Sequence, residues 1–165
     1  MARKVFLSRG SRISDAISPP TVDATRARLG GRVSAEAGPF RIGAIVDVAT
    51  AGGGARAGVV LAAELAAIDV LFERGHVKRS DPSAVTLRTG PAPEALRVAA
   101  ARAAIFGGLR EGQAVEVDRG EGVIARGVLR EKCRYGALVS LAGGVVLGVG
   151  FQRVSPAPGI ADAKS

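Results

Sequence analysis

The chain has 165 residues, a formal net charge of +8 and a hydrophobic fraction of 47%. This length and composition exclude global disorder and suffice for one good core, whereas two full domains would be crowded. One His, one Cys, one Tyr and no Trp or Asn are present, and the cations are 19 Arg against 4 Lys. A single Cys excludes an internal disulfide, and the counts exclude metal sites built on His or Cys clusters. We therefore expect no catalytic residues, no metal and no cofactor.

Nothing in the sequence predicts a membrane segment or a secretion signal. The longest apolar stretch, residues 58–72, is shorter than the roughly 18–20 residues of a membrane span and carries Glu64 and Asp69. The first cations, Arg3 and Lys4, are not followed by an apolar region of the signal-peptide type. We expect no membrane partner and a location in the cytoplasm or in a virion.

The two ends are expected to be extended. Residues 1–38 carry seven Lys/Arg against three Asp/Glu, and Pro19-Pro20 predicts that no helix forms there. This basic arm is either a disordered tail or a segment that orders on a neighbouring subunit or on nucleic acid. Residues 155–165 are expected to form a flexible tail. The part between them, residues 39–154, is expected to be one compact domain.

The first half of this domain is expected to alternate strands and helices. Residues 40–50 predict a strand and residues 51–58, AGGGARAG, a glycine-rich loop. A helix is expected from there to about Arg74, and Gly75 occupies the position of a C-terminal cap. The expected inner stripe of this helix is Leu61, Leu65, Ile68 and Phe72.

The second half is expected to be mostly strand. Residues 84–89 predict a strand and residues 91–106 a helix closed by Gly107-Gly108. The period then changes from 3.6 to 2, which predicts four short strands at 114–118, 123–130, 136–142 and 145–154. No internal repeat is evident. We therefore predict an α+β fold: a small sheet with two packed helices (β-α-β-α), then a four-stranded antiparallel barrel-like or meander region, with extended arms and a possible sub-boundary near 107–112.

The glycine-rich loop is one candidate binding site. Glycines allow close backbone approach to a phosphate, and a helix N-terminus favours the anion. The spacing matches neither the dinucleotide motif nor the Walker motif, so a connecting loop is the alternative that we favour. The candidate anion-binding residues are Gly52, Gly53, Gly54, Arg56 and Gly58.

A basic face is the second candidate site. Cations around a predicted strand turn would neutralise phosphates and give salt-dependent affinity. Four acidic residues lie among them, so a solvated mixed-charge surface is the alternative. The candidate residues for nucleic acid or an acidic partner are Arg3, Lys4, Arg9 and Arg12 in the arm and Arg119, Arg126, Arg130, Lys132 and Arg134 in the domain.

Two single residues are candidate reactive groups. His76 follows the predicted helix cap, where the helix dipole favours a structural imidazole. Cys133 lies between Lys132 and Arg134, which would lower its thiol pKa in a reactive nucleophile, and a plain surface or edge-strand Cys is the alternative that we favour. No Ser or Cys is an evident partner for His76, so neither residue is assigned to catalysis.

The segment LREGQAVEVDRGEGVIARGVL, residues 109–129, resembles the central strands of PUA-type RNA-binding barrels. The resemblance covers 21 of the 165 residues, and its motif is common to small β-barrels. It does not assign the chain to that family.

Three functions follow from these observations. The first hypothesis is a non-enzymatic structural protein, a subunit of a larger complex such as a shell or virion, held to other protein subunits by its arms. The second is a basic RNA-binding or other nucleic-acid-binding module with a small β-barrel. The third is a phosphate- or nucleotide-binding protein that uses the 51–58 loop.

Overall fold

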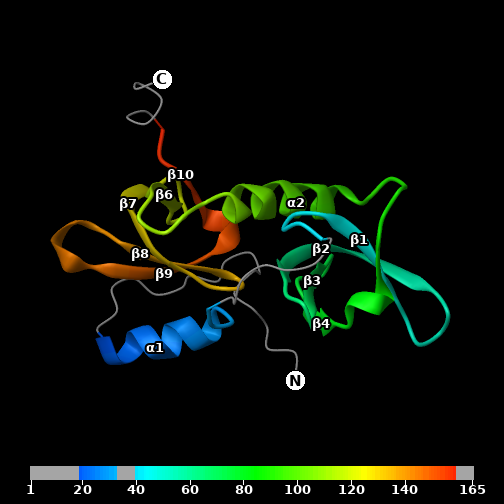
Figure 1. The fold of residues 1–165 in the computed structure, drawn as a ribbon. Helices are drawn as coiled ribbons and strands as arrows, with labels where there is room; N and C mark the ends of the chain where they lie inside the picture. Colours follow the sequence, from blue (N-terminus) through cyan, green and yellow to red (C-terminus); the bar gives the residue numbers. More distant parts are fainter. Residues whose placement is uncertain (1–18, 33–39, 159–165) are drawn as a thin grey trace.

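The described part of the chain folds into two five-stranded antiparallel sheets and two helices (Figure 1). The structure is a computed structural model, and it describes residues 19–32 and 40–158. Helix α1 (Pro19–Arg28) lies against the second sheet, and helix α2 (Glu94–Gly107) runs between the two sheets. Within these residues, no helix is long and apolar enough to cross a membrane.

The first sheet has the strand order β4-β3-β2-β1-β5. A 3₁₀ turn, Pro82–Ala84, precedes its last strand, which returns to pair with the first. The strands are β1 (Ile45–Ala49), β2 (Ala55–Ala63), β3 (Ile68–Phe72), β4 (Val77–Ser80) and β5 (Val85–Leu87).

The second sheet has the order β10-β6-β7-β8-β9. A 3₁₀ turn, Phe151–Arg153, precedes its last strand, which again pairs with the first. A further 3₁₀ turn, Ala142–Gly144, joins β8 to β9. The strands are β6 (Ala114–Asp118), β7 (Ile124–Lys132), β8 (Gly136–Ser140), β9 (Val146–Gly150) and β10 (Val154–Pro156).

The second sheet repeats the first at a constant spacing of 69 residues. Strand order, register, the bulge in the second strand and the 3₁₀ turn before the last strand all coincide. We call residues 40–89 the first unit and residues 109–158 the second unit. Matched features are the pairs Ile45–Val59 and Ala114–Val128, the bulges at Val60/Ala62 and Leu129/Glu131, and the closing pairs Val48–Val85 and Val117–Val154.

The expectation of no internal repeat is therefore wrong. Eleven of the fifty matched positions are identical, and apart from one arginine all are Gly or Val, so little sequence signal remains. Several of the glycines have positive φ, which side chains rarely adopt. The identical pairs are Arg41/Arg110, Gly43/Gly112, Val46/Val115, Val48/Val117, Gly53/Gly122, Gly58/Gly127, Val59/Val128, Val70/Val139, Gly75/Gly144, Val77/Val146 and Val85/Val154.

Each unit has an inner face built from matched positions. Val46, Val48, Val60, Val70 and Val85 are buried in the first unit, and their counterparts Val115, Val117, Leu129, Val139 and Val154 are buried in the second. We call the opposite side of each sheet its outer face.

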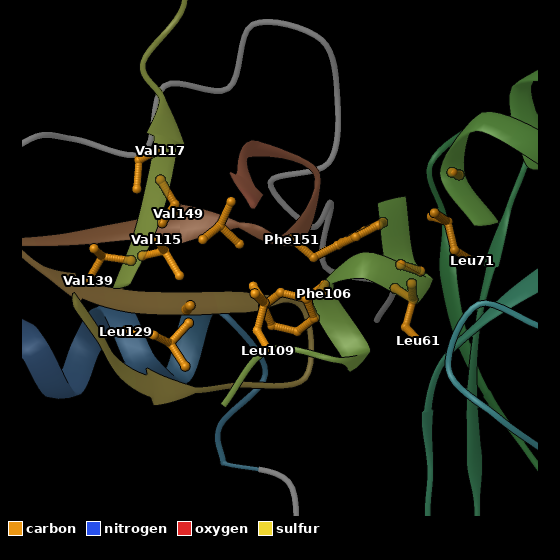
Figure 2. Close-up of a cluster of buried hydrophobic side chains, with 14 of the residues drawn as sticks. Leu61, Leu71, Phe106, Leu109, Val115, Val117, Leu129, Val139, Val149 and Phe151 are labelled. Atoms are coloured by element: carbon orange, nitrogen blue, oxygen red, sulfur yellow. The ribbon is translucent and has the colours of Figure 1, made fainter. Parts of the chain in front are cut away.

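Helix α2 joins the two units into one core. Its buried residues Leu96, Ala103 and Phe106 belong to the same cluster as Leu61 and Leu71 on the outer face of the first unit. Figure 2 shows Phe106 and Phe151 between these leucines and the valines of the second unit. The two rings have centroids 6.3 Å apart and a tilted arrangement typical of aromatic pairs.

The predicted α+β fold with one small sheet is wrong, because residues 59–74 form strands and not a helix. Strands β2 and β3 are buried on both faces, so they form a nearly continuous apolar run without the alternation of a half-exposed strand. The helical stripe is coincidental, since Leu65 is 83% exposed in the β2–β3 turn. The sheets do not close into a barrel.

The prediction of an extended N-terminal arm is also wrong where the structure describes it. Pro19 and Pro20 begin helix α1, because proline is tolerated in the first turn of a helix. Val22 and Leu29 then pack against Leu138 of the second unit. The remaining parts of the predicted arms, 1–18, 33–39 and 159–165, lie outside the described residues.

Other predicted elements are confirmed. The helix expected at 91–106 is α2, and the strand expected at 114–118 is β6. The strand expected at 84–89 contains β5, and the last expected strand, 145–154, divides into β9 and the start of β10. The sequence thus predicted the elements whose apolar residues recur at regular spacing or whose ends are marked by Pro or Gly.

The repeated glycines in the second strands generate a stability prediction. A Cβ at Gly127 would lie 2.5 Å from the carbonyl oxygen of Ser140, and one at Gly58 would lie 2.4 Å from Val70 Cγ1. We expect Gly58→Ala and Gly127→Ala each to lower the free energy of unfolding by about 1–3 kcal/mol, because the sheet must shift to admit the methyl group. Urea unfolding measures this, with Gly52→Ala as the control because its Cβ would meet nothing within 4 Å. Equal stability of all three variants would contradict the close approach.

Candidate functional site

The predicted glycine-rich loop is a β-hairpin turn between β1 and β2. The Thr50 N–H donates to the carbonyl of Gly54, and the Gly53 N–H donates to the carbonyl of Thr50. Gly53 has φ 82°, which suits glycine in a tight turn. Because β2 and not a helix follows the loop, the helix N-terminus on which the predicted phosphate site depends does not exist there.

The remaining residues of that predicted site have structural roles in β2. The Arg56 guanidinium lies over the Phe72 ring, 4.5 Å from its centroid. Gly58 allows β2 to approach Val70 closely. The structure therefore divides Gly52, Gly53 and Gly54, in or beside the turn, from Arg56 and Gly58, in the strand.

The predicted basic residues do not form one face. Arg126 pairs with Glu116 at 3.2 Å, and Arg130 is exposed on the same strand. Lys132 turns inward, where its Nζ donates to the carbonyls of Gly107 and Leu109 at the end of α2. Arg119 lies in the β6–β7 turn, and Arg3, Lys4, Arg9 and Arg12 lie outside the described residues.

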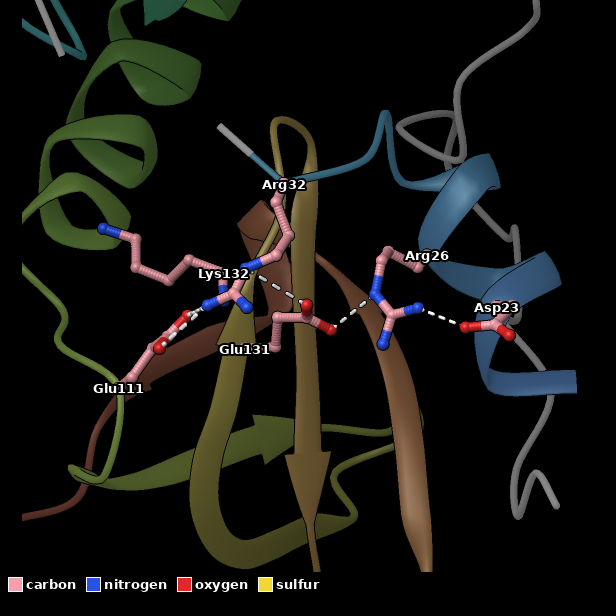
Figure 3. Close-up of polar contacts among 6 residues, drawn as sticks. All are labelled: Asp23, Arg26, Arg32, Glu111, Glu131 and Lys132. Carbon is pink, nitrogen blue, oxygen red and sulfur yellow. Dashed lines mark hydrogen bonds and ion pairs between the residues drawn. The ribbon is translucent and has the colours of Figure 1, made fainter. Parts of the chain in front are cut away.

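A network of ion pairs holds the segment after α1 on the second unit (Figure 3). Glu131, 7% exposed, accepts from Arg26 Nε at 2.8 Å and pairs with Arg32 Nε at 3.2 Å. Arg32 also donates to Glu111 at 3.0 Å, and Arg26 pairs with Asp23. Arginines that the sequence placed in a free arm are thus bound to the chain's own sheet.

A second network joins the two units. Arg134, in the β7–β8 turn, pairs with Glu64 and lies 3.2 Å from Asp69 Oδ2 of the first unit. Its Nε donates to the carbonyl of Gly30, so one guanidinium contacts both units and the segment after α1. Arg79 adds a further pair with Glu64 at 3.5 Å. The sequence offered no signal for this network, because Arg134 is 65–70 positions away from Asp69 and Glu64 along the chain.

The surroundings of two buried groups in this region shift their pKa values. Burial raises the pKa of Asp69, and the charge of Arg79 and a hydrogen bond from Tyr135 oppose that rise. Burial, with the nearby charge of Glu131, raises the pKa of the Cys133 thiol to about 12. The expected lowering by Lys132 and its neighbour is therefore wrong, since Lys132 is directed to the end of α2.

The other reactive candidate, His76, lies exposed in the β3–β4 turn. Its carbonyl accepts from the Phe72 N–H, and Gly75 supplies a residue with φ 84°. The predicted helix-end role is wrong because the helix is absent at this position. Across residues 19–32 and 40–158, no group of three or more His, Cys, Asp or Glu residues could hold a metal ion.

A shallow groove of about 600 Å³ lies between the β3–β4 turn and the first half of α2. Glu73, Arg74 and Glu94 contribute charges of both signs, and Gln152 of the second unit closes one side. The groove has no concentration of one charge that would select a ligand class.

Exposed apolar side chains lie in pairs on α2 and on β7, and Leu65, Leu87 and Val123 are exposed elsewhere. On α2, Val98 is 54% and Ile105 is 41% exposed, on the side opposite the buried stripe. On β7, Ile124 is 53% and Val128 is 45% exposed. Sequence analysis missed both, although the spacing of seven on α2 and the alternation along β7 are visible in the sequence.

No family model matches the chain, and no curated protein matches its sequence.

The buried network around Arg134 generates the second prediction. Arg134→Met removes the nearer and more buried of the two cations beside Glu64 and Asp69 and leaves Arg79, so we expect a loss of about 3 kcal/mol in the free energy of unfolding. Arg126→Met is the matched control, because its pair is exposed and should cost less than about 1 kcal/mol. Urea unfolding of both variants measures the difference, and similar losses would show that the network does not join the units.

The Cys133 thiol generates the third prediction. In the folded protein its raised pKa and burial keep the reactive thiolate scarce, so Ellman's reagent at pH 8 should label it at least about 100-fold more slowly than after unfolding. Absorbance at 412 nm, with and without guanidinium, measures both rates. Rapid stoichiometric labelling of the native chain would contradict the structure.

Proposed function

We propose that this protein is a non-enzymatic structural protein, a subunit that assembles with other protein subunits. The observation that carries the proposal is the apolar stripe on the outer side of α2, formed by Val98, Ala101 and Ile105. Exposed apolar side chains grouped on one side of a fixed element are typical of protein contacts.

The position of α2 supports this use. Its other side is held between both units by Leu96, Ala103 and Phe106, so the exposed stripe is presented without a large loss of conformational freedom on binding. The small side chain of Ala101 in the centre of the stripe permits close approach by a partner. Arg26 and Arg134 are held in ion pairs within the chain, so they are not free to bind an acidic ligand.

A nucleic-acid-binding module is the second candidate. Arg41, Arg97, Arg102 and Arg110 are exposed, and no acidic partner is found for them among residues 19–32 and 40–158. Phosphate contacts by such side chains would give affinity that falls steeply with salt. They are spread over several elements, which makes this candidate weaker than the first.

The mass of the purified chain in high salt tests the proposal. Light scattering after size exclusion should give a discrete multiple of 16.7 kDa, because high salt strips nucleic acid and leaves apolar contacts intact. Val98→Glu with Ile105→Glu should reduce the mass to that of the monomer. Leu87→Glu, at a similarly exposed position on β5, is the control and should leave the mass unchanged.

A monomeric wild-type chain would overturn self-assembly. If that monomer carried nucleic acid at low salt, as seen from absorbance at 260 nm, the second candidate would take its place.

A further inference from the structure

The outer face of the first unit is covered by α2. Val59, Leu61 and Leu71 on this face are at most 3% exposed and share a cluster with the buried side of α2. The contact is close, because a Cβ at Gly43 would lie 2.9 Å from the carbonyl oxygen of Ala100. In the first unit this face is therefore a helix-docking surface.

Among residues 19–32 and 40–158, no helix covers the matched end of the second unit in this way. The counterpart of Val59 is Val128, which is 45% exposed, and the counterpart of Leu61 is Arg130, which is exposed. The counterpart of Gly43 is Gly112, which has a similar positive φ, and a Cβ there would meet nothing within 4 Å. The second unit thus has the backbone of the docking surface, and α2 does not lie on it.

Helix α1 covers only the other end of this face. It packs on Leu138 and Val146, and its following segment reaches Glu131. Beyond that end, β7 exposes Ile124, Arg126 and Val128 at alternate positions, and Arg130 is exposed at the bulge that follows. We call these four residues the open β7 face.

The charge of the open β7 face defines what would fit it. Two apolar side chains alternate with two arginines, of which Arg126 is partly neutralised by Glu116. Arg130 is exposed and has no acidic partner among the residues that the structure describes. A matching partner offers an apolar stripe flanked by acidic side chains.

We propose that the open β7 face docks an amphipathic helix of a partner protein, with apolar residues at helical spacing and acidic flanks. The proposal rests on the proposed function, since it names one contact of an assembling subunit, and it follows the geometry that α2 adopts on the first unit. The exposed side of α2 in a second copy is a poor occupant, because Arg97 and Arg102 flank its apolar stripe and would face Arg126 and Arg130.

Two peptides that differ only in charge test the proposal on the full chain. The probe is a helix-stabilised peptide with the sequence of residues 91–108 carrying Arg97→Glu and Arg102→Glu, and its control is the unchanged sequence. Arg97 and Arg102 lie on either side of the stripe of α2 that packs on the first unit, so the substitutions place carboxylates beside an apolar face that already docks on the matched sheet. Fluorescence anisotropy should show saturable binding of the acidic peptide, at least about tenfold tighter than that of the control.

Variants of the chain locate the binding. Val128→Asp and, independently, Arg130→Glu should each weaken binding of the acidic peptide at least about tenfold, because the first removes the apolar contact and the second reverses the charge. Both positions are exposed, and unchanged thermal unfolding verifies the fold. Leu87→Asp on β5 of the first unit is the control and should bind as the wild type does.

Three results would overturn the proposal: no binding at about 1 mM peptide, equal binding of the two peptides, or binding that Val128→Asp and Arg130→Glu leave unchanged. Binding that appears only after deletion of residues 1–18 would make that segment the occupant and would also overturn it. The outcome is separable from self-assembly. A monomer that binds the acidic peptide rejects self-assembly and keeps the helix site, whereas an oligomer that does not bind it does the reverse.

Discussion

The structure depends on the burial of one helix between two sheets. Helix α2 places Leu96 and Ala103 against the outer face of the first unit and Phe106 against Phe151 of the second. Its alanines allow the close contact with the loop at Gly43, and Lys132 binds the carbonyls at its end. Without this helix the two units would share mainly the arginine network around Arg134, whose charges cost free energy to bury.

The two units have the same backbone arrangement, but their outer faces contact different parts of the chain. Their inner faces both contain valines, because two closely packed cores on the same backbone accept side chains of the same size and shape. Their outer faces have diverged, so that Leu61 under α2 corresponds to exposed Arg130, and Asp69 in an ion pair corresponds to Leu138 under α1. The covered outer face of the first sheet belongs to the common core, whereas Val128 and Arg130 on the second sheet are exposed.

Sequence analysis found the elements whose pattern is local. Helix α2 and strand β6 were predicted from the spacing of their apolar residues and from the Pro and Gly residues at their ends. Strands β2 and β3 were mistaken for a helix because both of their faces are buried. The repeat was hidden because its identities are nearly all Gly and Val, residues that recur in any small sheet. The inward orientation of Lys132 and Arg134 depends on contacts between distant segments, which no single stretch of sequence records. Absence of catalytic residues was a prediction from composition, and it remains one.

The separation along the chain between α1 and its binding surface has a consequence for folding. The pair Arg26–Glu131 spans 105 positions, whereas most strand pairs join neighbours in sequence. Closing that long loop is entropically costly until the sheet exists, so the hairpins of each unit can form before α1 docks. During synthesis the first unit leaves the ribosome complete while the strands that receive α1 are still missing. Helix α1 is therefore expected to be the last element to join the fold and the first to leave it.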